Sequence, residues 1–346
     1  MCSAAAAFFT CAASAALFLS AASATLFTCA ASAQLPRVGD INFYGLHILT
    51  PEQILAAARL APGDTVPSSR IDLEDRIIAL PDVMDAHVQS VCCDGDRTTL
   101  FIGIHERGEI EVEFRVAPSG PSTLPEDLMT RYRKYSGALL RAGMNGIANW
   151  NDASMRRDEE YFRTFAVAHT VKLRTELHTG SDPEQRAAAA TATGYSANKK
   201  TAVDDLLFAL QDPDEGVRTN ALRALAAIAV VARRQPALGI RIPAAGLVDL
   251  LNSVVLSDRM ESTKALLVLS ERQNAAVLDL IRERALPSLA EMARWRTQSY
   301  AQPPFQLLGR VAGLKDAQIS ESWEKGDREP VIQQALDSAP KKPGLQ

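Results

Sequence analysis

The sequence is poor in the residues on which many enzyme sites depend. Its 346 residues include 5 His, 5 Cys and 3 Trp, and aromatic residues make up 6%. No HExxH motif, zinc-finger spacing, phosphate-binding loop, dinucleotide fingerprint or nucleophile elbow occurs in it. The sequence therefore predicts no cofactor and no metal site, and we expect no small-molecule ligand.

A surplus of positive charge is also missing. Lys and Arg together number 37 and Asp and Glu 41, which gives a formal net charge of −4. Proteins that bind nucleic acid usually carry a strong basic surplus, so we expect no nucleic-acid partner. The hydrophobic fraction of 47% is enough for a folded core. A chain of this length predicts about two domains.

Charge is absent from the first 33 residues, which contain 14 alanines and end in Ala31-Ser32-Ala33. A small-x-small ending after an apolar stretch is typical of a signal-peptidase site. We therefore predict a signal peptide at 1–33 and a periplasmic or secreted protein without a later membrane span. The basic residue that usually begins a signal peptide is missing, because the first one is Arg37. The alternative is an uncleaved N-terminal helix that anchors the chain in the membrane.

Residues 38–107 mix the periods of strands and helices. The order is a short strand at 41–45, a helix after the capping box that begins at Thr50, a helix over 69–80, and strands at 86–93 and 98–105. Asp94-Gly95-Asp96 between the last two strands is a hairpin signal. The pattern predicts a small α+β domain of the order β-α-α-β-β.

This domain resembles the POTRA domain of outer-membrane-assembly and cell-division proteins. The matching motifs are Phe43-x-Gly45, Gly63-Asp64, Ile71-Asp72, Leu80-Pro81-x-Val83, Ala86-x-Val88 and Ile104-x-Glu106-Arg107. The resemblance implies a module beyond the inner membrane that binds other proteins, often by adding a strand to an exposed sheet edge.

The rest of the chain is divided by composition. Residues 108–153 contain Pro118-Ser119-Gly120-Pro121 and predict a linker. Residues 154–338 predict an all-α solenoid, because apolar stripes at helical spacing recur there with periods of roughly 30–45 residues. Residues 339–346 predict a flexible tail.

One helical unit shows the pattern of the solenoid. The stripe of Val203, Leu206 and Leu210 leads to a turn, and a second stripe begins at Val217. The stretch Leu210-Gln211-Asp212-Pro213-Asp214-x-x-Val217-Arg218 resembles HEAT repeats, especially the short HEAT-like repeats of phycobilin lyases, and residues of about 168–315 resemble a series of such units. We expect Asp212, Asp214 and Arg218 to serve the fold by capping helices and bonding a neighbouring turn.

The vicinal pair Cys92-Cys93 is the main candidate for chemistry. It is interpreted either as one buried and one exposed thiol, or as a redox pair, a soft-metal site or an intermolecular disulfide, with His87 and His105 nearby. A match of Ser196 and Lys199 to the Ser-x-x-Lys motif lacks the helper motifs of acyl enzymes and is interpreted as chance.

Trp295 lies between Arg294 and Arg296 and is interpreted either as an exposed partner-binding residue or as a Trp packed at a repeat junction. The sequence thus predicts a non-catalytic scaffold for protein–protein interaction in the cell envelope. Two alternatives stay open. One is a HEAT-like lyase-type or cofactor-binding enzyme, and the other is a thiol-redox or metal protein that uses Cys92 and Cys93.

Overall fold

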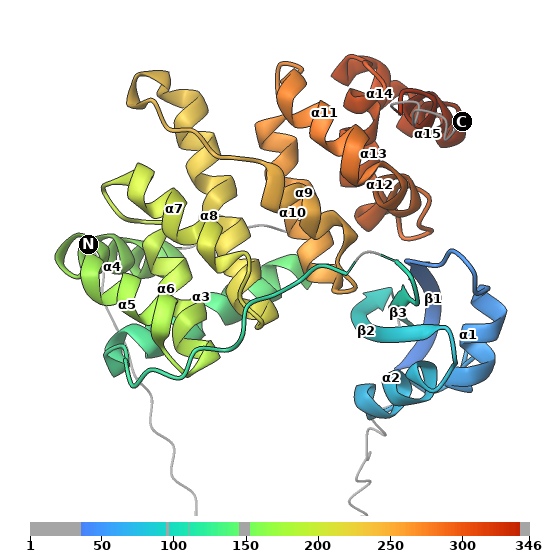
Figure 1. The fold of residues 1–346 in the computed structure, drawn as a ribbon, viewed down its shortest axis with the longest axis horizontal. Helices are drawn as coiled ribbons and strands as arrows, with labels where there is room; N and C mark the ends of the chain where they lie inside the picture. The colour runs from blue at the N-terminus through green and yellow to red at the C-terminus, as the bar shows by residue number, and fades with distance from the viewer. Residues whose placement is uncertain (1–35, 95–96, 110, 145–152, 340–346) are drawn as a thin grey trace, which may run out of the picture. The chain divides into compact units, whose positions relative to one another are not determined.

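The computed structural model describes residues 36–94, 97–109, 111–144 and 153–339. The predicted signal peptide at 1–33 lies outside these residues, and so does the predicted tail beyond Ala339. The described part begins with a three-stranded sheet and two helices and continues with helices alone (Figure 1).

The sheet module has the predicted order of elements. It comprises β1 (Arg37–Tyr44), α1 (Pro51–Ala58), α2 (Arg70–Ile78), β2 (Val83–Asp94) and β3 (Arg97–Glu106). The capping box at Thr50 is confirmed, because Thr50 Oγ1 accepts from Gln53 N and the Gln53 side chain accepts from Thr50 N. The strand order is β1-β3-β2, with β1 parallel and β2 antiparallel to β3.

The two faces of the sheet enter different cores. Leu100, Ile102 and Ile104 of β3 are buried with residues of α1 and α2, as their alternation predicts. Phe101 points to the opposite face and belongs to the core of the helical part. One face of the sheet is therefore covered by its own helices and the other by the helical units that follow.

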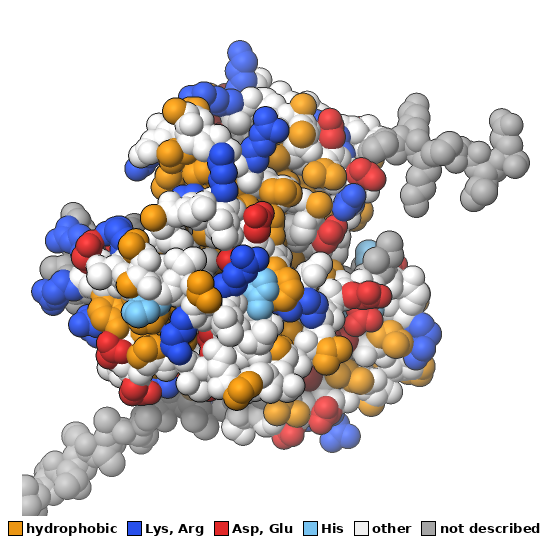
Figure 2. Space-filling model, turned by 60° about the vertical axis from the view of Figure 1, so that its left-hand side comes forward, with side chains coloured by type: hydrophobic (Ala, Val, Ile, Leu, Met, Phe, Trp, Pro, Cys, Tyr) orange, Lys and Arg blue, Asp and Glu red, His pale blue; other side chains and the backbone are white. Residues whose placement is uncertain are grey.

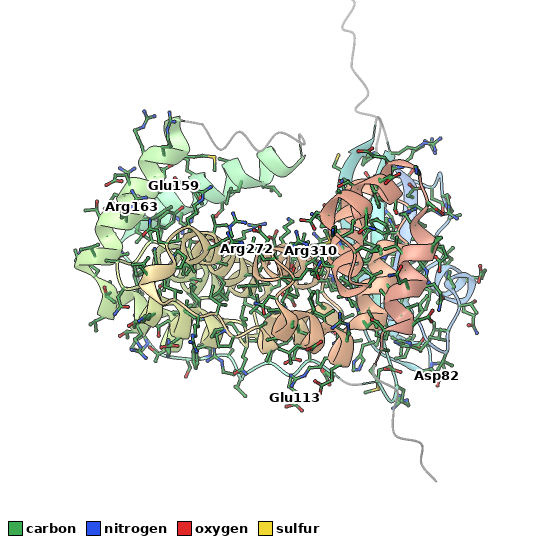
Figure 3. The ribbon with its side chains drawn as sticks, turned by 90° about the horizontal axis from the view of Figure 1, so that it is seen from above. Asp82, Glu113, Glu159, Arg163, Arg272 and Arg310 are labelled. Carbon is green, nitrogen blue, oxygen red and sulfur yellow. The ribbon has the colours of Figure 1, made fainter. Side chains whose placement is uncertain are left out.

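The segment expected to be a linker contains α3 (Glu126–Met144) and an ordered extended stretch, the strap (residues 111–124). Arg115 N donates to Gln211 O at 2.7 Å, and Gly120 N donates to Thr179 O at 2.7 Å. The strap is thus fixed along the helical units. The sequence left open whether this connection is rigid or mobile, and for this stretch the structure shows an ordered one. Figure 3 shows Glu113 of the strap on one side of these units and Glu159 and Arg163 of α4 on the other.

The remaining helices form the solenoid, in which α6, α8, α10 and α13 pack against one another in turn. Helices α5 and α7 contact each other in a second row, as do α9 and α11. The bounds are α4 (Ala153–Ala168), α5 (Thr170–Thr179), α6 (Pro183–Thr193), α7 (Lys199–Ala209), α8 (Glu215–Arg234), α9 (Ala245–Asp249), α10 (Leu256–Leu269), α11 (Ala275–Arg284), α12 (Leu286–Ala293), α13 (Gln298–Val311), α14 (Asp316–Glu324) and α15 (Arg328–Asp337), with short 3-10 turns at η1 (Pro236–Leu238) and η2 (Leu250–Asn252).

Buried arginines join successive units. Arg186 binds both carboxylate oxygens of Asp212 at 2.8 and 2.9 Å, and Arg218 binds both carboxylate oxygens of Asp258 at 2.8 and 3.0 Å. Each guanidinium also donates to two backbone carbonyls five and six residues before it. We call these two pairs the arginine ladder.

The ladder confirms that Asp212 and Arg218 serve the fold. Asp214 does so too, since its Oδ1 accepts from Val217 N at 3.0 Å and caps α8. None of the described helices combines the length and apolar character needed to cross a membrane.

Candidate docking surfaces

The outer edge of β1 is covered by the helical units. Trp295, just after α12, donates from Nε1 to Phe43 O at 3.1 Å, and Glu291 of α12 accepts from Gly45 N at 2.9 Å. Both backbone groups face away from β3, so the helices satisfy the edge that a further strand would otherwise pair with.

Trp295 is therefore part of an internal junction. Only 4% of it is exposed, and its ring centroid lies 5.0 Å from that of Phe101 and 5.7 Å from that of Tyr44. The expectation of an exposed docking residue is not met at Trp295, whereas packing at a junction is observed. The reason is that β3 offers Phe101 on the face that the helices cover.

Tyr44 fixes the same junction from the strand side. Its hydroxyl donates to Val254 O at 2.9 Å, and the Arg259 guanidinium lies 4.6 Å from the centroid of its ring. Burial raises the pKa of Tyr44, so the hydroxyl stays a donor at all working pH values. A Cβ added to Gly103 would overlap the Tyr44 ring and Val254 O, so this close approach requires glycine.

The charged side chains buried at this junction pair with each other. Arg259 Nη1 lies 3.4 Å from Glu291 Oε2. Burial raises the pKa of the Glu291 carboxyl, and Arg259 acts in the opposite direction. Asn42 adds two neutral bonds, since its side chain donates to Thr297 Oγ1 and accepts from Arg296 N, each at 2.9 Å.

A cavity of about 460 Å³ opens beside this junction, lined in part by Ile41, Leu46, His47 and Arg294. Two of its charged groups are already bonded, because Glu291 holds Gly45 N and Arg294 pairs with Glu329 at 2.5 Å. The cavity offers space next to the sheet, with much of its charge already neutralised.

The other edge of the sheet, β2, pairs with no further strand in the described residues. Val88 N donates to Glu74 Oε1 at 2.7 Å, and Ala86 N donates to Asp85 Oδ1 at 2.8 Å. These two N–H groups therefore point away from β3. Because alternate residues of a strand direct their backbone groups to the same side, Ser90 points its N–H and C=O outward as well.

Exposed apolar side chains border the β2 edge. Ile71 is 64% exposed and Met84 50%, and Ile78 is also exposed. Ile71 and Ile78 lie three residues before and four residues after Glu74 on α2, so all three share one side of that helix. The β2 edge together with Ile71, Ile78 and Met84 is the first candidate docking surface, which we call the β2 surface.

The cysteines and histidines predicted to carry chemistry either lie apart from one another or already have bonding partners. Cys92 is exposed and disulfide-bonded, and the side chain of Cys93 lies outside the described part. The register places His87 opposite Gly103 and His105 opposite Asp85, so the two histidines are not cross-strand partners. Within the ranges that the structure describes, no three His, Cys, Asp or Glu side chains form a group that could hold a metal ion.

The Ser-x-x-Lys match lies in a turn between units. Ser196 is buried, and Lys199 Nζ donates to Gly194 O at 2.7 Å, which holds the end of α6. Burial lowers the pKa of Lys199. This bond gives the lysine a structural partner.

No local sequence pattern marks Glu291, Asn42 or Glu74 as residues that bond at a sheet edge, because their partners lie in other elements. The arginine ladder left a partial signal, since an Asp-Pro pair precedes Arg186 by four residues and another precedes Arg218 by six.

Comparison with known proteins locates the repeats. The family model of HEAT repeats matches residues 170–266. Among solved structures, an engineered protein determined by a structural genomics consortium is 16% identical, with a TM-score of 0.35, over 62% of this chain and 96% of that chain. No curated protein matches the sequence. Residues 170–266 are thus HEAT repeats by sequence, and the match does not extend to the sheet module.

Proposed function

We propose that this chain is a non-catalytic scaffold of the cell envelope in which a POTRA-like module is fixed to a HEAT-like solenoid. HEAT repeats at 170–266 support a role in protein interaction, because stacked helical pairs offer extended surfaces to partners. The buried charges of the solenoid support it too, since Arg186, Asp212, Arg218 and Asp258 are all engaged in holding units together.

The observation that carries the proposal is the difference between the two sheet edges. The β1 edge is closed by Trp295 and Glu291, whereas β2 pairs with no strand in the described residues. Proteins usually protect a long edge strand, because its free backbone groups pair readily with other chains. On β2, side chains of the module bond the N–H groups of Ala86 and Val88, and the outward groups of Ser90 stay available. This part of the edge, with its apolar border, suits a partner that adds a strand.

The POTRA-like identity of the module and the export of the chain belong to this proposal. The β-α-α-β-β order supports the first, and the apolar leader that ends in Ala31-Ser32-Ala33 supports the second. Under this proposal the β2 surface faces partners in the periplasm or outside the cell.

Replacing Ser90 with Pro tests the proposal at one backbone group. The outward N–H of Ser90 makes no bond to β3, so Ser90→Pro removes a docking donor and leaves the ladder of the sheet in place. With a photoreactive residue in place of Gln89, the chain should form a defined crosslinked adduct with its partner. Ser90→Pro should abolish this adduct and leave the thermal unfolding of the chain unchanged. The matched control is a photoreactive residue at exposed Arg157 of α4, which should give no such adduct.

Two results would contradict the proposal. One is an adduct of equal yield from the chain with and without Ser90→Pro. The other is the absence of any specific adduct from the folded wild-type chain in an envelope fraction.

A further inference from the structure

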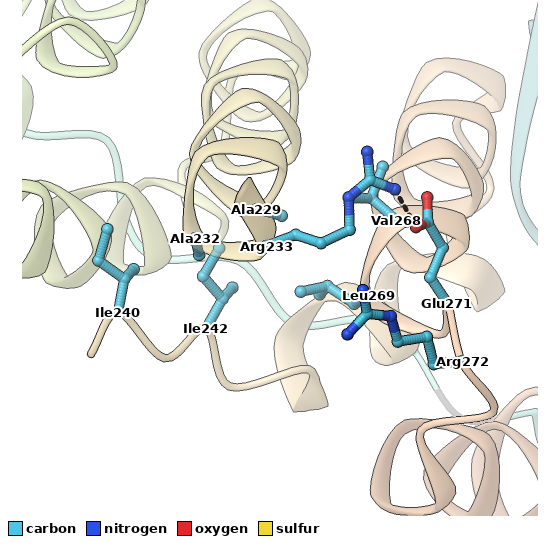
Figure 4. A pocket seen from close by; sticks show the side chains of 9 residues that line it. All are labelled: Ala229, Ala232, Arg233, Ile240, Ile242, Val268, Leu269, Glu271 and Arg272. Atoms are coloured by element: carbon cyan, nitrogen blue, oxygen red, sulfur yellow. Dashed lines mark hydrogen bonds and ion pairs between the residues drawn. The ribbon is translucent and has the colours of Figure 1, made fainter. Parts of the chain in front are cut away.

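A second cavity lies at the end of α8, where the loop before α9 meets the end of α10. It measures about 240 Å³, and its apolar wall consists of Ala229, Ala232, Ile240, Ile242, Val268 and Leu269 (Figure 4). This volume is below the range of roughly 300–1,000 Å³ that is usual for small-molecule sites. The pocket therefore suits a single side chain better than a cofactor.

Basic residues lie at this pocket or next to its lining residues in the sequence. Arg233 and Glu271 at its rim pair with each other, so they contribute little net charge. Arg272 lines the pocket, whereas Arg234 and Arg241 directly neighbour the lining residues in the sequence. All three are exposed, and in the described part of the chain they make no side-chain hydrogen bond or ion pair. Figure 2 shows Lys and Arg side chains gathered at the upper end of the visible face. The chain as a whole has a net charge of −4, so these three arginines form a local basic patch.

The turn that carries Arg272 has an uncommon backbone. Arg272 and Gln273 have φ values of 59° and 57°, which side chains other than glycine rarely adopt. Gln273 Nε2 donates to Leu314 O at 2.9 Å and holds the turn against the following unit. Strained turns persist where their surroundings fix them, and they are frequent in ligand-binding segments.

We infer that this end of the solenoid binds an acidic peptide segment of a partner protein, with one aliphatic or aromatic side chain in the pocket. The carboxylates of the segment would bind Arg234, Arg241 and Arg272, because guanidinium groups form strong, directional bonds with carboxylates. The inference rests on the proposed scaffold function and adds the chemical class of one partner. A diacyl lipid fits less well, since the pocket has room for one side chain only.

The inference is tested with a displayed library of random heptapeptides, which is selected for binding to the chain from residue 34 to residue 346. We expect selection to enrich peptides with one apolar residue among Asp and Glu. Arg241→Glu should weaken the binding of the enriched peptide by roughly tenfold or more through charge repulsion. Ala232→Trp should weaken it as well, because it fills the pocket and leaves the charge unchanged.

Arg157→Glu is the matched control, since Arg157 is also exposed and the variant has the same net charge as Arg241→Glu. It should bind the peptide as the wild type does. The inference is overturned if the enriched peptides are not acidic, or if they bind Arg241→Glu and Ala232→Trp as tightly as the wild type. Binding of phosphatidylglycerol vesicles that depends on Arg241, without peptide binding, would also overturn it.

The outcomes separate this inference from the scaffold proposal. If the wild-type chain forms no adduct that depends on Ser90 but still binds the peptide, the β2 surface is ruled out and the pocket stands. The opposite result removes the pocket and leaves the scaffold.

Discussion

Trp295 Nε1 donates a hydrogen bond to the carbonyl oxygen of Phe43, which lies 252 residues earlier in the chain. This bond joins the first strand of the sheet module to the turn after α12. It satisfies a backbone group of an edge strand and buries the indole between the two parts. The stability of the junction should therefore depend strongly on this one side chain.

Replacing Trp295 tests the junction in two steps. Trp295→Phe keeps most of the packing but leaves Phe43 O without its donor, which should cost about 1–3 kcal/mol of unfolding free energy. Trp295→Ala also leaves a cavity, and a loss of about 3–5 kcal/mol is expected. Urea denaturation followed by circular dichroism measures both. Equal stability of the two variants would show that the hydrogen bond and the packing do not contribute as described.

The arginine ladder predicts a large effect of removing one charge of a buried pair. Arg218→Met leaves the Asp258 carboxylate buried without its partner and should cost about 3–5 kcal/mol of unfolding free energy. The double variant Arg218→Met with Asp258→Leu should recover part of this loss, because no lone charge remains. Arg157→Met on the surface serves as the control and should change stability by less than about 0.5 kcal/mol. A double variant no more stable than the single one would argue against the charge explanation.

Glu176 predicts a pH dependence. Its side chain is fully buried, and this burial raises the pKa of the carboxyl, while a hydrogen bond from Ser122 and the charge of Lys172 act in the opposite direction. The folded chain then binds the proton more tightly than the unfolded chain does. The unfolding free energy should therefore fall as the pH rises above the unfolded pKa of about 4.3.

Glu176→Gln removes this proton and leaves the size of the side chain almost unchanged. The variant should be more stable than the wild type at pH 8 and about equally stable at pH 4, as measured by urea denaturation across this range. Glu159→Gln, at a partly exposed site, is the control. A constant difference between Glu176→Gln and the wild type at all pH values would contradict the assignment.

The leader makes a prediction about processing. If residues 1–33 are a signal peptide, the mature chain begins at Gln34, and N-terminal sequencing of the exported protein should find that residue. Replacing Ala33 with Leu should block cleavage, because the peptidase site requires small side chains. The uncleaved form would then be larger on a gel. Identical processing of the wild type and Ala33→Leu would exclude cleavage at this position.

Local patterns predicted much of the fold. The capping box at Thr50, the hairpin between β2 and β3 and the helix that begins after Asp214 each depend on residues close together in the chain, and each is present. Helix α3 was missed, although Leu128, Tyr132 and Tyr135 follow a helical spacing, because the Pro- and Gly-rich stretch before it led to the prediction of a linker over all of 108–153.

The candidate surfaces were predicted less completely. A usable sheet edge was expected, but which edge stays open depends on Glu291 and Trp295, which meet β1 only in the folded chain. The pocket at the end of α8 was not predicted either. Its wall combines Ala229, Ile240 and Leu269 from three segments, and none of these residues differs locally from an ordinary core residue.

The strap has a mechanical consequence. It leads from the sheet module, which is attached beside α12, back to α3 and the first helical units. The strap therefore connects the region of α12 with the first helical units by a second length of chain. A stack of helical pairs without such a connection extends elastically under force. In this protein we expect the solenoid to resist extension until the strap detaches from Gln211 and Thr179.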